Sequence, residues 1–166
     1  AVAQTSETYP VYYPRPGWVE QNPQEWWQAV CRAARNLMEE TGIRPERIAG
    51  IGVDGQSWSA IPVDGEGNCL ANTPIWMDTR AREICRKVQA DGLEPWIFSV
   101  SGNGVSPSYT TPKMMWLKEN RPEIYEKTAA VGMFNDWLIY KLTGVLAVEP
   151  SNGSTTGLFD LQSRNW

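Results

Sequence analysis

Three short segments of the chain combine aromatic rings with side chains that can read hydroxyl groups. They are residues 54–59 (DGQSWS), 74–80 (PIWMDTR) and 106–113 (SPSYTTPK). Buried amides and carboxylates can hold a polyhydroxylated ligand such as a sugar by paired hydrogen bonds, while an aromatic face covers its apolar C–H side. Composition alone makes this only a suggestion, because each segment also has a purely structural interpretation.

The first segment follows an apolar run at residues 48–53, which predicts a buried strand that enters a loop. Side chains just beyond the carboxyl end of a strand line the usual ligand crevice of an open α/β sheet. This position favours Gln56, Ser57 and Trp58 as binding residues. The structural alternative, which spacing alone favours, is a tight turn with Gln56 solvated and Trp58 in the core.

The other two segments carry one strong candidate each. Asp78 is interpreted first as a cap of the helix that follows, paired with Arg80 or Arg82, and second as a ligand for a substrate hydroxyl. Tyr109 is the strongest candidate of the third segment. Lys113 is expected to be a solvated cation at a helix start rather than a phosphate ligand.

Several kinds of chemistry are excluded by residue type. The chain has no histidine, so catalytic triads that use this base are absent, and no Gly-Lys pair offers a Walker-type phosphate loop. Cys31, Cys69 and Cys85 are an odd set without CxxC spacing, so zinc and disulfide frameworks are disfavoured. The sequence therefore predicts no metal site and a reducing, cytoplasmic compartment.

Length and charge limit the partners. With 166 residues, 42% of them hydrophobic, the chain can form one domain or part of a larger one. A net charge of −4 without a Lys/Arg run provides no basic surface for binding nucleic acid. The sequence has no apolar run near the ~20 residues of a membrane span and no signal peptide at its start. We expect neither a nucleic-acid nor a membrane partner.

Hydrophobic periodicity predicts the elements that must position these segments. A helix is expected from Pro23, capped by Asn22, to a stop at Gly42, and a hairpin from strand 60–63 closing near Leu70. The remaining predictions are an edge strand and loop in 1–19, helices at 79–89, 111–120 and 135–144 (capped by Asn135), a strand at 129–133 and an extended stretch at 145–148. Strands alternating with helices indicate an α/β sheet.

These segments together resemble the FGGY carbohydrate kinases, and within them the xylulokinase-like branch. Residues 54–56 with the next two residues resemble that family's sugar loop, and residues 75–80 its Trp-x-Asp-x-Arg segment. Residues 109–117 resemble its aromatic-Thr-x-Pro-Lys-x-x-Trp-Leu segment, and residues 135–144 with 151–154 the stretch that comes next. Four segments in the family's order are far more specific than any one of them.

The resemblance implies a ribonuclease-H-like, actin-type ATPase fold. Residues 1–166 would be part of the first domain, a mixed sheet flanked by helices, with the sugar in a cleft that faces an ATP-binding second domain. By position, the resemblance implies substrate-binding roles for Gln56, Ser57, Trp58, Trp76, Asp78 and Tyr109. The chain departs from the family at Ser57-Trp58, where xylulokinases usually have Met-His and glycerol kinases Arg-Glu. The sugar therefore stays open, and Trp58 predicts a pocket that stacks on its ligand.

The resemblance also implies an activity that this chain does not perform alone. Family members carry an Asp-x-Gly-Thr phosphate-binding hairpin, a catalytic Asp beyond the matched region and an ATP site mainly in the second domain, and none is found in this sequence. The intact protein is expected to transfer phosphate from ATP, with Mg²⁺, to a hydroxyl of a small sugar, either a ketose such as xylulose or a polyol. Asp54 is interpreted as a turn-stabilising acid, so no catalytic residue is assigned.

Two alternatives stay open. The chain could be a noncatalytic sugar-binding or regulatory module with an actin-like fold, or a scaffold element whose tryptophans only pack. Missing neighbours of the sheet would also expose edges and apolar surface, which predicts marginal stability or self-association as a homodimer.

Overall fold

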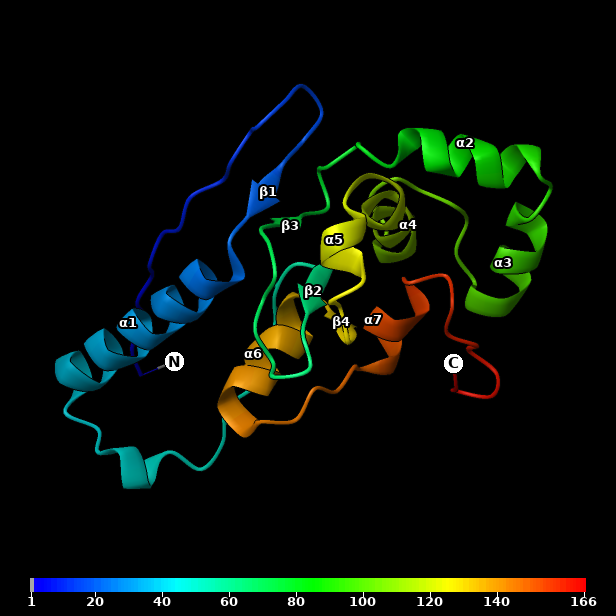
Figure 1. Ribbon diagram of the computed structural model, residues 1–166. Helices are drawn as coiled ribbons and strands as arrows, with labels where there is room; N and C mark the ends of the chain where they lie inside the picture. The colour runs from blue at the N-terminus through cyan, green and yellow to red at the C-terminus, as the bar shows by residue number, and fades with distance from the viewer. Residues whose placement is uncertain (1) are drawn as a thin grey trace.

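The computed structural model describes residues 2–166 and consists of two small sheets surrounded by helices (Figure 1). The elements, in chain order, are β1 (Glu20–Gln21), α1 (Pro23–Thr41), the 3₁₀ turn η1 (Pro45–Arg47), β2 (Ile61–Val63), β3 (Thr73–Pro74), α2 (Arg82–Ala90), α3 (Glu94–Ser101), α4 (Thr110–Asn120), α5 (Pro122–Tyr125), β4 (Ala130–Gly132), α6 (Phe134–Thr143) and α7 (Pro150–Ser154). This content confirms the predicted α/β class.

Helix α1 begins and ends where its sequence signals predict. The Asn22 side chain accepts a hydrogen bond from the backbone N–H of Gln24 (2.9 Å), and Pro23 occupies the first helical position. At the other end Gly42 adopts a left-handed φ of 66° and donates its N–H to the carbonyl of Met38. Local chemistry is therefore sufficient to define this helix.

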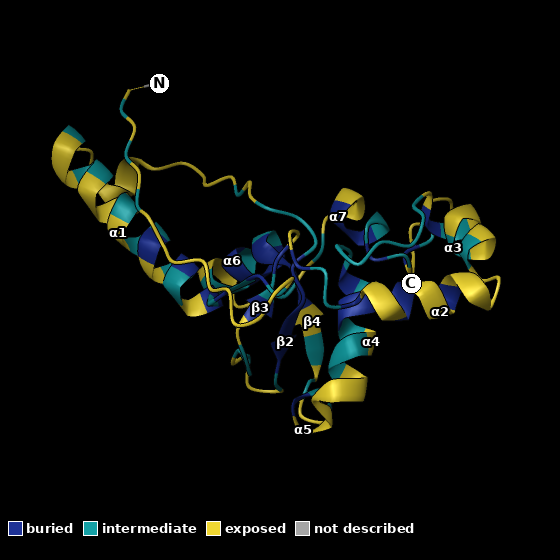
Figure 2. Ribbon diagram, turned by 90° about the horizontal axis from the view of Figure 1, so that it is seen from above, coloured by how far each residue is buried: buried dark blue, intermediate teal, exposed yellow. Residues whose placement is uncertain are grey.

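The core lies where α1 and α6 meet the sheet of β2 and β4, which pair antiparallel with Ile61 opposite Gly132. Trp26 of α1 and Trp137 of α6 are both fully buried, and the Trp26 ring packs on Phe134 at 4.7 Å. Figure 2 shows the buried positions gathered around these elements, while the far end of α1 is exposed. The core thus holds the start of α1 and leaves its end projecting.

A second sheet pairs β1 with β3 antiparallel, with Gln21 opposite Thr73. Within residues 2–19 the only bridge joins Tyr12 to Glu20, so the predicted N-terminal edge strand is reduced to one pair. The predicted hairpin is confirmed: Val63 bridges Cys69 across a turn that Gly67 closes at a φ of 84°. Prolines and short pairing keep these strands brief.

The predicted buried strand at residues 48–53 is wrong. This stretch has no strand assignment, and Ile51 is 69% exposed. In the part of the chain that the structure describes, no backbone–backbone hydrogen bond involves the N–H groups of residues 49–57. The physical reason is that a strand exists only by pairing, and none of the described strands lies beside this run.

Helix boundaries show smaller corrections. Helix α6 begins at Phe134, where the Asp136 carboxylate accepts the N–H of Met133 (2.9 Å), so Asn135 is not its cap. Helix α2 begins at Arg82 rather than Thr79. Helices α3, α5 and α7 were not predicted, since they are short and lack a clear periodic apolar face.

The cysteines are unpaired thiols, as Cys31, Cys69 and Cys85 make no disulfide. Burial raises the pKa of Cys69 to about 12 and that of Cys85 to about 11, so both stay protonated at neutral pH. These two are therefore poor nucleophiles.

None of the helices in residues 2–166 combines the length and apolar composition needed to cross a bilayer.

Candidate functional site

The loop at residues 54–59 is held by side chains from both ends of the chain. Gln56 Nε2 donates to Gln21 Oε1 (2.6 Å), which also accepts the indole N–H of Trp26 (3.2 Å). Ser57 Oγ donates to Asn152 Oδ1 of α7 (3.1 Å). Gln56 is thus half-buried and hydrogen-bonded rather than solvated.

Trp58 has a strained backbone and an unusual environment. Its φ of 68° lies in the left-handed region, which costs a bulky residue on the order of 1–2 kcal/mol. Its ring packs on Tyr109 with centroids 5.4 Å apart and planes tilted by 51°. Within residues 2–166 its buried indole N–H has no hydrogen-bond partner. Strain held in place by surrounding structure is typical of ligand-binding positions.

Unpartnered polar atoms gather around this loop. The described part of the chain has five buried side-chain polar atoms without a partner, and three of them are Trp58 Nε1, Ser59 Oγ and Asn135 Oδ1. Asn135 lies against the loop, since a Cβ on Gly55 would come 3.0 Å from its Oδ1 and 2.3 Å from the ring of Phe134. Buried polar groups normally have partners, so a ligand hydroxyl would complete this arrangement.

Lys113 is buried, so the expectation of a solvated cation is wrong. It is only 1% exposed, and its ammonium donates to the backbone carbonyls of Trp58 (2.6 Å), Ile75 (2.8 Å) and Ser108 (2.5 Å). A lysine has three N–H donors, so these carbonyls satisfy it without a carboxylate partner. Each carbonyl belongs to a different one of the three segments singled out from the sequence. Their backbones therefore converge on one atom.

Asp78 lies in a buried ion-pair network. Its Oδ2 accepts the N–H of Val19 (2.7 Å) and the Arg80 guanidinium (2.7 Å), while Oδ1 accepts the backbone N–H of Arg80 (2.9 Å). Arg80 also pairs with Glu20 (2.7 Å) and stacks over the Trp18 ring at 4.0 Å. The predicted pairing with Arg80 is confirmed, whereas the predicted helix cap is wrong, because no side chain caps the start of α2. Both carboxylate oxygens are already used by the protein.

The structure thus groups four of the six predicted residues. Three of them, Gln56, Ser57 and Trp58, lie in the loop at residues 54–59, and the fourth, Tyr109, packs its ring on Trp58. Trp76, by contrast, is 47% exposed and makes no aromatic pair or side-chain hydrogen bond among the described residues. Sequence reasoning did not assign four neighbours to the site: Gln21, Lys113, Asn135 and Asn152. The last two lie in the fourth segment of the resemblance, which was a signal that could have found them.

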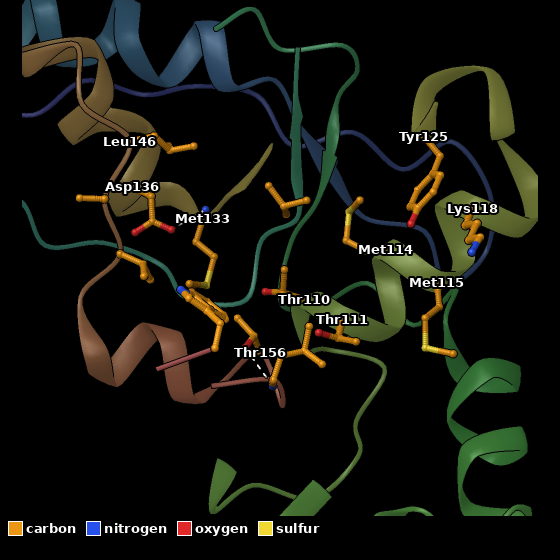
Figure 3. Close-up of a pocket in the computed structure, with 15 residues that line it drawn as sticks. Thr110, Thr111, Met114, Met115, Lys118, Tyr125, Met133, Asp136, Leu146 and Thr156 are labelled. Atoms are coloured by element: carbon orange, nitrogen blue, oxygen red, sulfur yellow. Dashed lines mark hydrogen bonds between the residues drawn. The ribbon is translucent and has the colours of Figure 1, made fainter. Parts of the chain in front are cut away.

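Two cavities lie next to this group, and none of the six predicted residues lines either. The larger, of about 570 Å³, is mainly apolar and includes Thr110 and Met114 of α4, Met133 and Asp136. Figure 3 shows Asp136 and Met133 at one end and Lys118 at the other. Burial raises the pKa of Asp136. The smaller, of about 250 Å³, is lined in part by Lys113.

Comparison with known proteins places this geometry in a class. Residues 1–166 match the family model described as "FGGY family of carbohydrate kinases, N-terminal domain". Xylulose kinase of Bacillus subtilis (strain 168) is 30% identical over 164 residues, 99% of this chain and 33% of that protein. Glycerol kinase of Thermococcus onnurineus (strain NA1) is 35% identical over 162 residues, 95% of this chain and 33% of that protein.

Structural similarity agrees with the sequence match. The crystal structure of a xyloylose kinase from Brucella ovis superposes with a TM-score of 0.91 at 31% identity, covering 98% of this chain and 34% of that one. The fold is that of a carbohydrate kinase's first domain, of the predicted actin-type ATPase class. This chain belongs to the FGGY family of carbohydrate kinases. It spans about a third of the length of the relatives that it matches.

Proposed function

We propose that the protein containing this chain phosphorylates a hydroxyl of a small sugar or polyol, and that this chain supplies the sugar-binding region. The observation that carries the proposal is the cluster of unpartnered polar atoms around the strained Trp58 loop. Membership in a family of carbohydrate kinases supports the reaction class. Fold similarity alone would not, because one fold hosts many functions.

The six candidate residues divide into distinct roles in this proposal. The Trp58 and Tyr109 rings cover the C–H face of the ligand, and the free indole N–H of Trp58 donates to a hydroxyl. Gln56 and Ser57 contribute polar atoms at the floor of the site. The exposed Trp76 ring is available to close over the ligand, and Asp78 positions that loop through Arg80. A ketose such as xylulose, or a polyol, suits this mixture.

We place ATP and Mg²⁺ mainly outside this chain. Among residues 2–166 no group of three His, Cys, Asp or Glu side chains is arranged to hold a metal ion. The relatives are about three times as long as the matched region, which leaves room for nucleotide-binding parts. We therefore expect the 166-residue chain to bind sugar and to show no turnover. Its free thiols suit a cytoplasmic setting, and its net charge of −4 suits no nucleic-acid partner.

A sugar panel tests the proposal. Ketoses and polyols are titrated against wild type, Trp58→Phe and Trp58→Ala, with binding followed by calorimetry. Loss of one hydrogen bond predicts about tenfold weaker affinity for Trp58→Phe, and loss of the ring predicts a larger decrease for Trp58→Ala. Trp96→Phe, in the exposed helix α3, is the matched control and should bind as wild type does.

The result separates the two functional classes. Sugar-dependent ADP release by the complete polypeptide supports the kinase, whereas binding without turnover supports the noncatalytic module. Affinities that stay unchanged in both Trp58 variants would sink the proposed site.

A further inference from the structure

We propose that Lys113 is a positioning residue that holds the three loops of the candidate sugar site in one arrangement, an inference that rests on the proposed function. Its ammonium reaches across 55 residues to Trp58, 38 to Ile75 and 5 to Ser108. No other side chain in residues 2–166 donates to backbone carbonyls from all three loops. One nitrogen atom is thus hydrogen-bonded to all three loops.

The connection to Trp58 is the most direct. Lys113 binds the carbonyl of the residue with left-handed φ, and Thr110 Oγ1 of the same helix donates to the next carbonyl, that of Ser59 (3.1 Å). Helix α4 therefore holds two consecutive carbonyls of the strained turn. This sets the direction in which the Trp58 ring leaves the backbone, toward Tyr109.

The ammonium geometry suits this task better than any substitute. The three N–H bonds of the ammonium match three carbonyl acceptors, one from each loop. A guanidinium presents its donors in a plane, and a thioether has none. Arginine should therefore restore the charge without restoring the placement of the loops.

The charged surroundings leave Lys113 without a direct counter-ion. Burial lowers its pKa to about 7, while the Asp78 carboxylate raises it and the Arg80 guanidinium lowers it further. Other charged groups on the elements packed around α4 are Glu20 and Arg121, which border the same 250 Å³ cavity, and the exposed pair Lys87–Glu119. Above pH 7 the amine keeps two donors for three carbonyls, so one loop loses its partner.

The absence of histidine makes this titration easy to observe. No side chain of the 166-residue sequence has an unperturbed pKa near 7. A change at the Trp58 loop near pH 7 that disappears in a Lys113 variant is therefore attributable to this amine.

The test compares wild type with Lys113→Met, Lys113→Arg and the control Lys127→Met, an exposed lysine after α5. Two signals are followed: affinity for the preferred sugar, and the indole N–H resonance of Trp58, assigned by its loss in Trp58→Phe. We expect Lys113→Met to bind at least about tenfold more weakly and to shift the indole resonance, with little rescue by Lys113→Arg. The control should match wild type.

A pH series tests whether the protonation of Lys113, and not only the bulk of its side chain, acts on the Trp58 loop. In wild type and the control, the indole resonance should change in one step near pH 7, and the step should vanish in Lys113→Met. A folded Lys113→Met with wild-type affinity and resonance would overturn the proposal. Should this variant not fold, a wild-type titration without a step near pH 7 would overturn it. If no sugar binds wild type, the proposed function fails while the resonance and pH step still decide the role of Lys113.

Discussion

Two charged side chains near the candidate site are buried in different ways. Lys113 is satisfied by three neutral carbonyls, whereas Asp78 is satisfied by a guanidinium and two backbone N–H groups. The first arrangement leaves the charge easy to remove near neutral pH, since burial opposes it. The second arrangement pairs two opposite charges directly.

Substitution of Asp78 should therefore destabilise the fold more than it changes chemistry. Asp78→Asn removes one of the two carboxylates from Arg80, whose side chain is only 4% exposed and keeps its pair with Glu20. The loss should therefore be smaller than the about 3–5 kcal/mol typical of a buried charge left without any partner. Urea unfolding of the purified chain measures this loss. Glu83→Gln breaks the exposed pair with Arg86 and should have little effect. Equal stability of the Asp78 variant and wild type would contradict the network's role.

At the scale of elements, the hairpin between β2 and residue 70 includes a close approach of Gly67 to Tyr140. The turn is held by Asp64, whose Oδ1 accepts the N–H groups of Glu66 (2.9 Å) and Asn68 (2.8 Å), and these bonds lower the pKa of its carboxyl. Gly67 then passes directly beneath the phenol of Tyr140 on α6. The hairpin is thus fixed by its own turn and by a helix distant in sequence.

Gly67→Ala should destabilise the chain. A Cβ would lie 1.7 Å from Tyr140 Oη at a φ of 84°, so the substitution forces both backbone strain and movement of the ring. We expect a loss of at least about 1–2 kcal/mol in thermal or urea unfolding. Gly65→Ala, in the same turn with no atom within 4 Å, should be close to neutral. The prediction fails if the two variants have the same stability.

For the whole molecule, the run at residues 48–53 is an apolar segment without strand pairing among the described residues. Its apolar side chains are largely exposed, with Ile51 at 69%, and its backbone makes no pairing with the described strands. Such a segment is a template for pairing with another chain. The proposed homodimer would have a ready contact here.

We expect the purified chain to self-associate, and Ile51→Lys to reduce this. Sedimentation velocity over a range of concentrations measures the effect, because a charge on the run opposes edge pairing. Val145→Lys is the matched control, since Val145 is 60% exposed in another loop and the charge change is the same. A monomeric wild type, or equal effects of both substitutions, would count against association through this segment.

The sequence by itself determined features whose causes are local. Asn22, Pro23 and Gly42 define α1, and the turn from Asp64 to Asn68 defines the hairpin, because capping and turn chemistry act within a few residues. The order of four motifs was also enough to indicate the family, which the comparisons confirm.

Only the tertiary structure decided what depends on distant partners. The 48–53 run looks like a buried strand in sequence, but pairing requires a neighbour that apolar pattern cannot supply. Lys113 looks like a solvated cation until three loops bring their carbonyls to it. Asn135 and Asn152 reach the candidate site only because α6 and α7 pack beside residues 55–57. Burial and convergence are properties of the folded chain, and no local spacing encodes them.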